Sequence, residues 1–329
     1  MPERTPKGWE TFRMGIQPLG VGGSTPATDR AMVPASLRLT TTRMPGRSAH
    51  SYGRAARWAL VCWAVGLVAQ GLLACGGGPS EEDVDRSIRE FTLAVSLREE
   101  GNVPGAIEHL RVALSLDPDN ARALVLLGYI HYQRGDLEAA EQYLRNGLAI
   151  LVERPDMAAT LAEARNMLGV VLIRQERYDE SIAVLTQSAS DVLNRTPWYA
   201  WGNLGLAHYE KGDYPQAVEA LSQAVRGEPR FCLGHFQLGR TFFAMERFQE
   251  AEEALTRALE ADERCGRFFQ DAWRLRGETR ARLGLREEAI TDFERCVELG
   301  AQSEAGRACR RFLDSGHEGG GEDVQSVGG

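Results

Sequence analysis

The chain has 329 residues, of which 43% are hydrophobic and 26% are charged, so it is long enough for two ordinary domains. Its 46 acidic residues outnumber its 38 basic residues, which gives a formal net charge of −8 at pH 7. This acidic balance argues against nucleic acid and anionic lipid headgroups as partners.

The N-terminal stretch lacks the apolar periodicity of a folded domain. Residues 1–43 are rich in Pro, Gly, Ser, Thr and Arg, and we expect a disordered or non-native extension there. Met44 is a better start, because it opens a basic segment that leads into an apolar run from Trp58 to Ala74. That run is shorter than the roughly 20 residues that span a bilayer. Residues 44–74 are therefore predicted to be a secretory signal peptide.

The end of this segment, Leu72-Leu73-Ala74-Cys75, resembles the lipobox of bacterial lipoproteins. The resemblance implies cleavage before Cys75, lipidation of Cys75 and a lipid-anchored chain. Gly76 follows in place of Asp, which in such lipoproteins implies sorting to the outer membrane. Removal of residues 1–74 leaves 29 basic and 43 acidic residues, a net charge of −14, so lipid must hold the chain at the membrane. Residues 75–86, which include Gly-Gly-Gly-Pro-Ser, are predicted to be a flexible tether.

The segment from Trp198 to Phe231 defines the repeating unit of the chain. It places large and small residues in a fixed order, at Trp201, Leu204, Gly205, Ala217, Leu221 and Pro229. This spacing resembles the tetratricopeptide (TPR) repeat, a helix–turn–helix unit of 34 residues. In this pattern the large residues face the partner helix, and the glycine and alanine lie where the two helices approach most closely.

The same pattern recurs on both sides of this unit, with insertions around Pro155–Leu161 and near Thr196–Pro197. We therefore predict an all-α, right-handed superhelical solenoid of about six TPR repeats, in a domain at residues 87–315. The first repeat has Ala94 in the glycine position, and the last has Arg276 in the leucine position. The repeats are expected at residues 87–120, 121–154, 162–195, 198–231, 232–265 and 270–303, followed by a capping helix and a disordered tail at 316–329.

Four cysteines follow the lipobox, and an even number in an oxidising compartment favours pairing. Cys232 opens the first helix of the fifth repeat and Cys265 follows its second helix. Because antiparallel helices bring these two ends together, we expect a disulfide between them. Cys296 and Cys309 are a candidate second pair. Two reduced, packed thiols are the alternative, and the absence of CxxC spacing argues against a metal site.

The chain contains no GxSxG, P-loop or HExxH motif, so we predict a protein that is not an enzyme and has no cofactor or small-molecule substrate. His131 and His208 occupy the tyrosine position of their repeats, where a packed side chain is expected in place of a catalytic one. Trp201 and Trp273 share another repeat position and are expected in the core.

The inner wall of a TPR array is formed by defined positions of the first helices. In this chain those positions carry apolar and aromatic residues that the packing of a single repeat does not require, which predicts an exposed apolar groove for a protein partner. The alternative is that inserted loops or the first repeat cover the strip. The predicted groove residues are Tyr129, Tyr132, Val170, Ile173, Tyr199, Leu206, Tyr209, Leu233, Phe236 and Phe243.

Together these features resemble the type IV pilus pilotins, the PilF/PilW/Tgl family of TPR lipoproteins. The residues that carry the resemblance are Asn166-Met167-Leu168-Gly169 and the segment from Asp191 to Gly205. The resemblance implies a monomeric outer-membrane lipoprotein that binds secretin subunits and promotes their localisation and multimer assembly. The alternative function is a general TPR scaffold lipoprotein that links other envelope complexes, in cell-wall synthesis or division.

Overall fold

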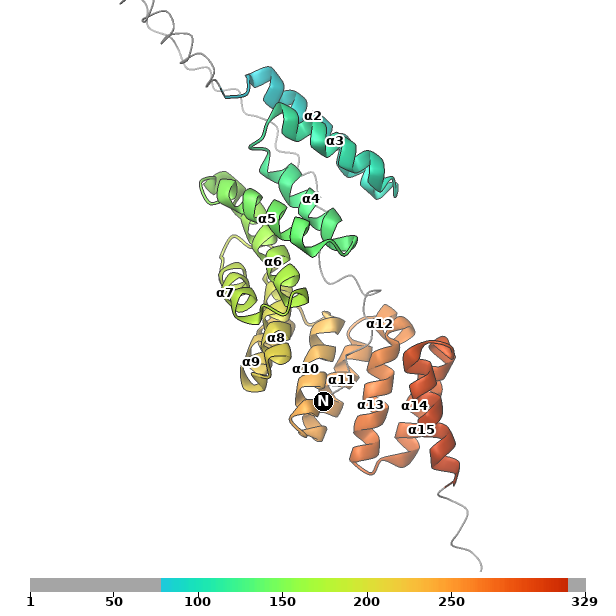
Figure 1. The fold of residues 1–329 in the computed structure, drawn as a ribbon. Helices are drawn as coiled ribbons and strands as arrows, with labels where there is room; N and C mark the ends of the chain where they lie inside the picture. The colour runs from blue at the N-terminus through green and yellow to red at the C-terminus, as the bar shows by residue number, and fades with distance from the viewer. Residues whose placement is uncertain (1–77, 319–329) are drawn as a thin grey trace, which may run out of the picture.

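The computed structural model describes residues 78–318, and within that range every regular element is a helix. Six antiparallel hairpins follow one another and stack into an elongated, twisted array (Figure 1). The hairpins are α2 (Glu81–Glu99) with α3 (Val103–Leu116), α4 (Ala121–Gln133) with α5 (Leu137–Leu151), α6 (Ala158–Arg174) with α7 (Tyr178–Ala189), α8 (Pro197–Lys211) with α9 (Tyr214–Gly227), α10 (Cys232–Ala244) with α11 (Phe248–Glu260), and α13 (Gln270–Arg282) with α14 (Arg286–Gly300). The predicted all-α solenoid fold is confirmed.

Three shorter or terminal elements complete the described chain. The 3₁₀ turn η2 (Pro155–Met157) precedes α6, α12 (Glu263–Phe268) lies between the last two hairpins, and α15 (Glu304–Glu318) packs on α14 at the end of the array. None of the helices in residues 78–318 is long and apolar enough to cross a bilayer.

Side-chain caps explain where several helices begin. Ser80 Oγ accepts a hydrogen bond from the backbone N–H of Asp83 at 3.1 Å, and Asn120 Oδ1 accepts one from Ala123 at 3.1 Å. Asn102 caps α3 in the same way. Each cap satisfies a backbone donor that the first helical turn leaves free, which contributes about 1 kcal/mol.

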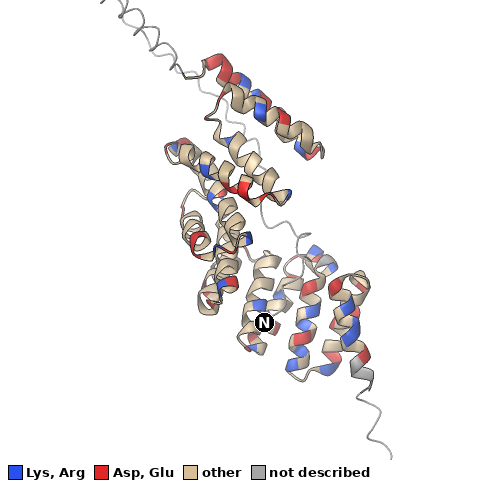
Figure 2. Cartoon of the chain, in the orientation of Figure 1, with Lys and Arg blue, Asp and Glu red and all other residues tan. Residues whose placement is uncertain are grey.

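Helix α2 begins earlier than the sequence analysis predicted. Residues 81–86 were assigned to a flexible tether, but they form the first turns of α2, so that part of the prediction is wrong. The cause is local: Ser80 caps the helix, and Glu81, Glu82 and Asp83 place negative charge at its positive end, as the first turn of α2 in Figure 2 shows. The predicted tether residues 75–77 and the lipidation site Cys75 lie outside the described residues.

The predicted start of the disordered tail, residue 316, is also wrong, because residues 316–318 form the last turn of α15. The remainder of the tail, residues 319–329, lies outside the described residues, as do the predicted extension and signal peptide.

In five of the six hairpins the two helices meet at a glycine, and in the first hairpin Ala94 takes this position. A Cβ atom placed on Gly205 would lie 2.4 Å from Leu221 Cγ, and one on Gly169 would lie 2.4 Å from Leu185 Cγ. Both leucine side chains are fully buried, so they have no room to move. This close approach is the reason for the glycine in the repeat pattern, as the sequence analysis expected.

One turn position shows left-handed backbone in all six hairpins. It is occupied by glycine in four of them, at 101, 135, 212 and 284, with φ between 78° and 90°. The third and fifth hairpins carry Glu176 and Glu246 there, with φ of 61° and 57°. A residue with a Cβ atom is strained in this conformation, by roughly 1–2 kcal/mol.

Replacing Glu246 by glycine is therefore expected to raise the free energy of unfolding by about 1 kcal/mol, because the relief of strain exceeds the added entropy of the unfolded chain. Urea unfolding followed by circular dichroism would measure it. The matched control is Gly135→Glu at the same position of the second hairpin, and its free energy of unfolding should fall by a similar amount. Equal stability of all three proteins would contradict the assignment of strain.

The sixth hairpin has a buried ion pair at the position of the repeat's leucine. Arg276, which replaces the repeat's leucine, donates to Asp292 from Nε at 2.9 Å and from Nη2 at 2.7 Å. The two side chains are only 8% and 0% exposed. Arg280 also contacts Asp292 at 3.0 Å, and Thr256 accepts from Arg276 at 3.1 Å. The polar substitution in the leucine position is thus compensated by partners from α11 and α14.

Candidate partner-binding surface

The structure divides the ten predicted groove residues into two groups. Six are less than a tenth exposed, so the prediction of an exposed strip is wrong for them. The reason is packing between neighbouring hairpins, which a single repeat does not reveal: the Phe236 ring lies 4.7 Å from that of Phe269, across the junction to α13. The six buried residues are Tyr129, Val170, Ile173, Leu206, Leu233 and Phe236.

The other four predicted residues are half-buried, and three of them occupy one equivalent position. Tyr132, Tyr209 and Phe243 each lie in the last turn of a first helix, on α4, α8 and α10. We call these three residues the aromatic row. In α6 the equivalent residue is Ile173, which is buried. The row therefore offers aromatic surface from three hairpins, with an apolar residue between the first and the second.

The aromatic row is held in place by contacts within each hairpin. The Tyr209 ring lies 5.4 Å from the ring of Tyr214, the first residue of α9. The Phe243 ring lies 5.5 Å from the ring of Phe248, the first residue of α11. These contacts restrict the Tyr209 and Phe243 side chains, so that less conformational entropy remains to be lost when the exposed part of each ring is covered.

Arginines from neighbouring hairpins lie over the row. The Arg240 guanidinium carbon is 3.8 Å from the Tyr209 ring centroid, and its Nη2 donates to Glu210 at 2.8 Å. Arg174 lies 5.9 Å from the ring of Tyr132. Such cation–π contacts contribute about 0.5–2 kcal/mol each. Burial raises the pKa of the Tyr209 phenol, so Tyr209 stays neutral at physiological pH.

Tyr199 is separate from the row because it lies at the opposite end of α8. Its ring contacts Phe231 edge-on at 5.4 Å and Trp198 at 5.7 Å. Gly202 faces the same Phe231 ring. Tyr199 therefore helps to close the junction between the fourth and fifth hairpins.

The two histidines at the tyrosine position pack as the sequence analysis expected. His131 stacks on Tyr143 at 5.2 Å, and its Nδ1 lies 3.0 Å from Asp136. Burial lowers the pKa of His208, so that this side chain is neutral at pH 7. Residues 78–318 contain no group of three or more His, Cys, Asp or Glu side chains that could hold a metal ion.

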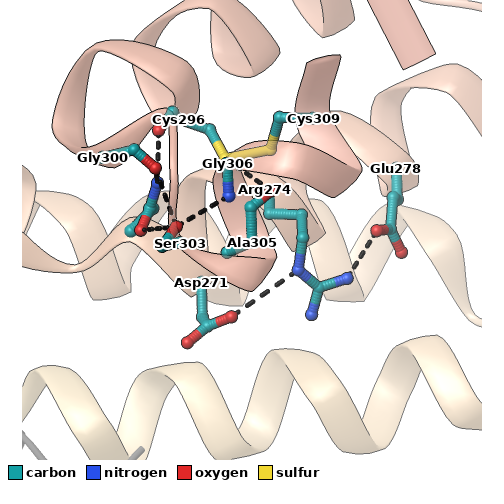
Figure 3. The surroundings of a disulfide bond; sticks show 10 residues. Asp271, Arg274, Glu278, Cys296, Gly300, Ser303, Ala305, Gly306 and Cys309 are labelled. Atoms are coloured by element: carbon teal, nitrogen blue, oxygen red, sulfur yellow. Dashed lines mark hydrogen bonds and ion pairs between the residues drawn. A yellow bond between two sulfur atoms is a disulfide. The ribbon is translucent and has the colours of Figure 1, made fainter. Parts of the chain in front are cut away.

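The structure brings both predicted cysteine pairs together. Cys232, the first residue of α10, is joined to Cys265 in α12, and Cys296 in α14 is joined to Cys309 in α15; the Cα atoms are 6.3 Å apart in each pair. The second pair ties the last helix to the array (Figure 3). Ser303 starts that helix, because its Oγ accepts from the backbone N–H of Gly306 at 2.9 Å.

Non-reducing peptide mass spectrometry of the protein purified from the cell envelope should show Cys232 linked to Cys265, and Cys296 linked to Cys309. The two cysteines are separated by 33 positions in the first pair and by 13 in the second. Each is expected to stabilise the fold by about 3 kcal/mol through restriction of the unfolded chain, measured as the loss on conversion of a pair to serine. Free thiols at these positions, or crossed pairs, would show that the prediction is wrong.

Antiparallel helix pairs that stack in one array, with half-buried aromatic side chains at a repeated position, define an α-solenoid of the protein-binding kind. Two family profiles, both described as tetratricopeptide repeat, match residues 97–164 and residues 166–230 and 236–304, which together are more than half of the chain. The chain belongs to the tetratricopeptide repeat family.

Two solved structures of pilus proteins share the fold. The crystal structure of PilW, a widely conserved type IV pilus biogenesis factor, superposes with a TM-score of 0.60 and 22% identity, over 67% of this chain and 96% of that one. PilF of Pseudomonas aeruginosa superposes with a TM-score of 0.59 and 19% identity, over 71% of this chain and 100% of that one. These likenesses establish the fold.

Among curated proteins, the type IV pilus assembly protein PilF of Pseudomonas aeruginosa is 27% identical over 167 residues, 49% of this chain and 64% of its own length. The BBSome complex member BBS4 of Bos taurus is 25% identical over 171 residues, 52% of this chain and 31% of its own length. The chain thus spans less than two thirds of the curated relatives it matches.

Proposed function

We propose that this chain is a non-enzymatic, lipid-anchored outer-membrane protein that binds secretin subunits and promotes their multimer assembly in type IV pilus biogenesis. The observation that carries its binding role is the aromatic row, because half-buried aromatics on a rigid scaffold bury a large area at low entropic cost. The similarity to PilF supports the pilus assignment, and the lipobox that ends at Cys75 supports the anchor.

The chemistry of the row indicates what the partner segment must offer. A partner segment with apolar side chains, spaced to match successive hairpins, would cover the parts of Tyr132, Tyr209 and Phe243 that remain exposed. Arg240 and Glu210 lie beside the middle ring as an ion pair. An apolar segment of a secretin subunit with polar groups between its anchors would satisfy both requirements.

Alanine substitution in the row tests this role with purified proteins. Tyr209→Ala and Phe243→Ala are each expected to weaken binding to a secretin subunit by about thirtyfold, the value of a hot spot worth 2 kcal/mol. Isothermal titration calorimetry would measure the affinity, and circular dichroism should show an intact fold.

Two control variants separate binding from folding. Leu285→Ala removes an apolar side chain that is 39% exposed in the last hairpin, and should leave the affinity unchanged. Phe236→Ala removes a buried ring of the array core, and should lower the melting temperature. Unchanged affinity in both row variants would show that secretin does not bind at the row.

A further inference from the structure

Three of the seven exposed large apolar side chains in the described residues lie in two loops that the proposed binding role does not use. Val152 follows α5 and is 53% exposed. Val192 and Leu193 lie between α7 and α8, and are 94% and 57% exposed. We call these three residues the loop ridge. They lie beside two of the insertions that interrupt the regular spacing of the repeats, those around Pro155–Leu161 and near Thr196–Pro197.

Polar contacts hold both loops in shape and keep the ridge from folding back onto the core. Arg154 pairs with Asp156 at 3.1 Å in the first loop. In the second loop, Asp191 accepts from the backbone N–H of Leu193 at 3.0 Å and pairs with Arg165 at 3.5 Å. Asn194 donates to the Ser188 carbonyl at 2.8 Å. The loops are thus braced while their apolar side chains point into solvent.

The order of the helices places the loop ridge at the edge where the chain enters the array. In a row of antiparallel hairpins, each second helix ends at the edge where the next first helix begins. The ridge loops follow second helices α5 and α7, and α2 also begins at this edge (Figure 1). Only five residues separate Cys75 from Glu81, the first residue of α2, and this segment extends at most about 20 Å.

We propose that the loop ridge rests on the phospholipid bilayer, with Val152, Val192 and Leu193 inserted among the headgroups. The inference rests on the proposed anchor at Cys75. Three aliphatic side chains are too few for lasting attachment alone, but an anchored domain meets the bilayer at high effective concentration. Their burial then decides which edge of the domain faces the membrane.

This orientation explains how the aromatic row is presented. Tyr132, Tyr209 and Phe243 lie in the last turns of first helices, at the edge opposite to the loop ridge. Helices of 13 to 15 residues separate the two edges by about 20 Å. With the ridge on the bilayer, the row points into the aqueous space where a partner can reach it.

The electrostatics of the ridge favour apolar insertion over attraction to anionic headgroups. Arg154 and Arg165, next to the exposed side chains, are each paired with an aspartate. The exposed Arg195 lies in the field of Glu163, and the exposed Glu153 adjoins Val152. The rest of the chain is acidic. We therefore expect the contact with vesicles of phosphatidylethanolamine to be the same with or without phosphatidylglycerol.

Nitroxide labels on the full, lipidated chain test the orientation. Val192→Cys and Leu285→Cys place a label in the ridge and at the opposite edge, in the turn before α14. On vesicles, the ratio of collisions with oxygen to collisions with a water-soluble nickel chelate should rise severalfold at 192 and stay unchanged at 285. A label at Val152→Cys should also show this increase in the collision ratio on vesicles. The increase should disappear when Val192→Asp and Leu193→Asp are added, because the charges keep the loop in water.

The outcomes separate this inference from the proposed anchor. If the wild-type chain does not float with vesicles, both the anchor and the inference are overturned. If it floats while the label at 192 stays in water, the inference alone is overturned, and a protein partner becomes the better occupant of the ridge. Equal lipid exposure at 192 and 285, or exposure that requires phosphatidylglycerol, also contradicts apolar insertion of this edge.

Discussion

Replacement of Asp292 by alanine is expected to lower the free energy of unfolding by about 3–5 kcal/mol, which is the cost of leaving a buried charge without its partner. Asp292 is fully buried and accepts two hydrogen bonds from Arg276. The Arg276 side chain is itself only 8% exposed, so water cannot replace the carboxylate. Arg280 keeps its second partner, Glu252, at 2.8 Å. Urea unfolding of the variant and the wild type would measure the difference.

Two further variants show whether burial causes this loss. Glu253→Ala removes an exposed partner of Arg257 on α11, and should change stability by less than about 1 kcal/mol. The double variant Arg276→Leu, Asp292→Leu replaces the pair by apolar residues and should recover most of the loss, because neither charge then remains buried. A loss below about 1 kcal/mol in Asp292→Ala would contradict the buried ion pair.

Replacement of Cys75 by alanine is expected to abolish attachment of the chain to the outer membrane and to leave an unprocessed or soluble precursor. The proposed lipids on Cys75 supply the attachment, since each buried methylene contributes about 0.8 kcal/mol and the acidic chain offers no polybasic surface. Membrane and soluble fractions from cells that express the variant, separated by flotation and probed with an antibody, would measure it.

The matched control is Gly76→Ala, which leaves the cysteine in place and should fractionate as the wild type does. A Cys75→Ala protein that still floats with the outer membrane would show that the lipoprotein prediction is wrong.

The regular part of the fold could be predicted because every 34-residue unit has the same contacts between its two helices, and these contacts require the same residue types at the same positions. Gly205 must be small wherever Leu221 crosses it, so the pattern marks both helices and the turn between them. The start of α2 also had a signal that the sequence analysis did not use: Ser80, followed by three acidic residues, is a helix cap. The Gly-rich stretch before Ser80 favoured a flexible tether, and the predicted tether extended to residue 86 although α2 begins at Glu81.

The exposure of the groove residues could not be predicted from the repeat alone. The repeat defines which residues face the inner wall, but contacts with the next hairpin decide which of them are covered. Phe236 is buried by Phe269, which lies in an insertion with no place in the repeat. For the Arg276–Asp292 pair the sequence did hold a signal, because Arg276 stands where the repeat has leucine and a buried arginine needs an acidic partner.

Secretin assembly in living cells tests the central claim most directly. A chain carrying Tyr132→Ala, Tyr209→Ala and Phe243→Ala should accumulate at the outer membrane at the wild-type level, since the fully buried leucines of the hairpins still form the core and the anchor is unchanged. Heat-resistant secretin multimers, detected by immunoblotting of unreduced membranes, should then be lost and the secretin should run as a monomer. Multimers at the wild-type level, in cells where the triple variant is folded and membrane-bound, would contradict the proposal that the aromatic row is where this protein holds its partner.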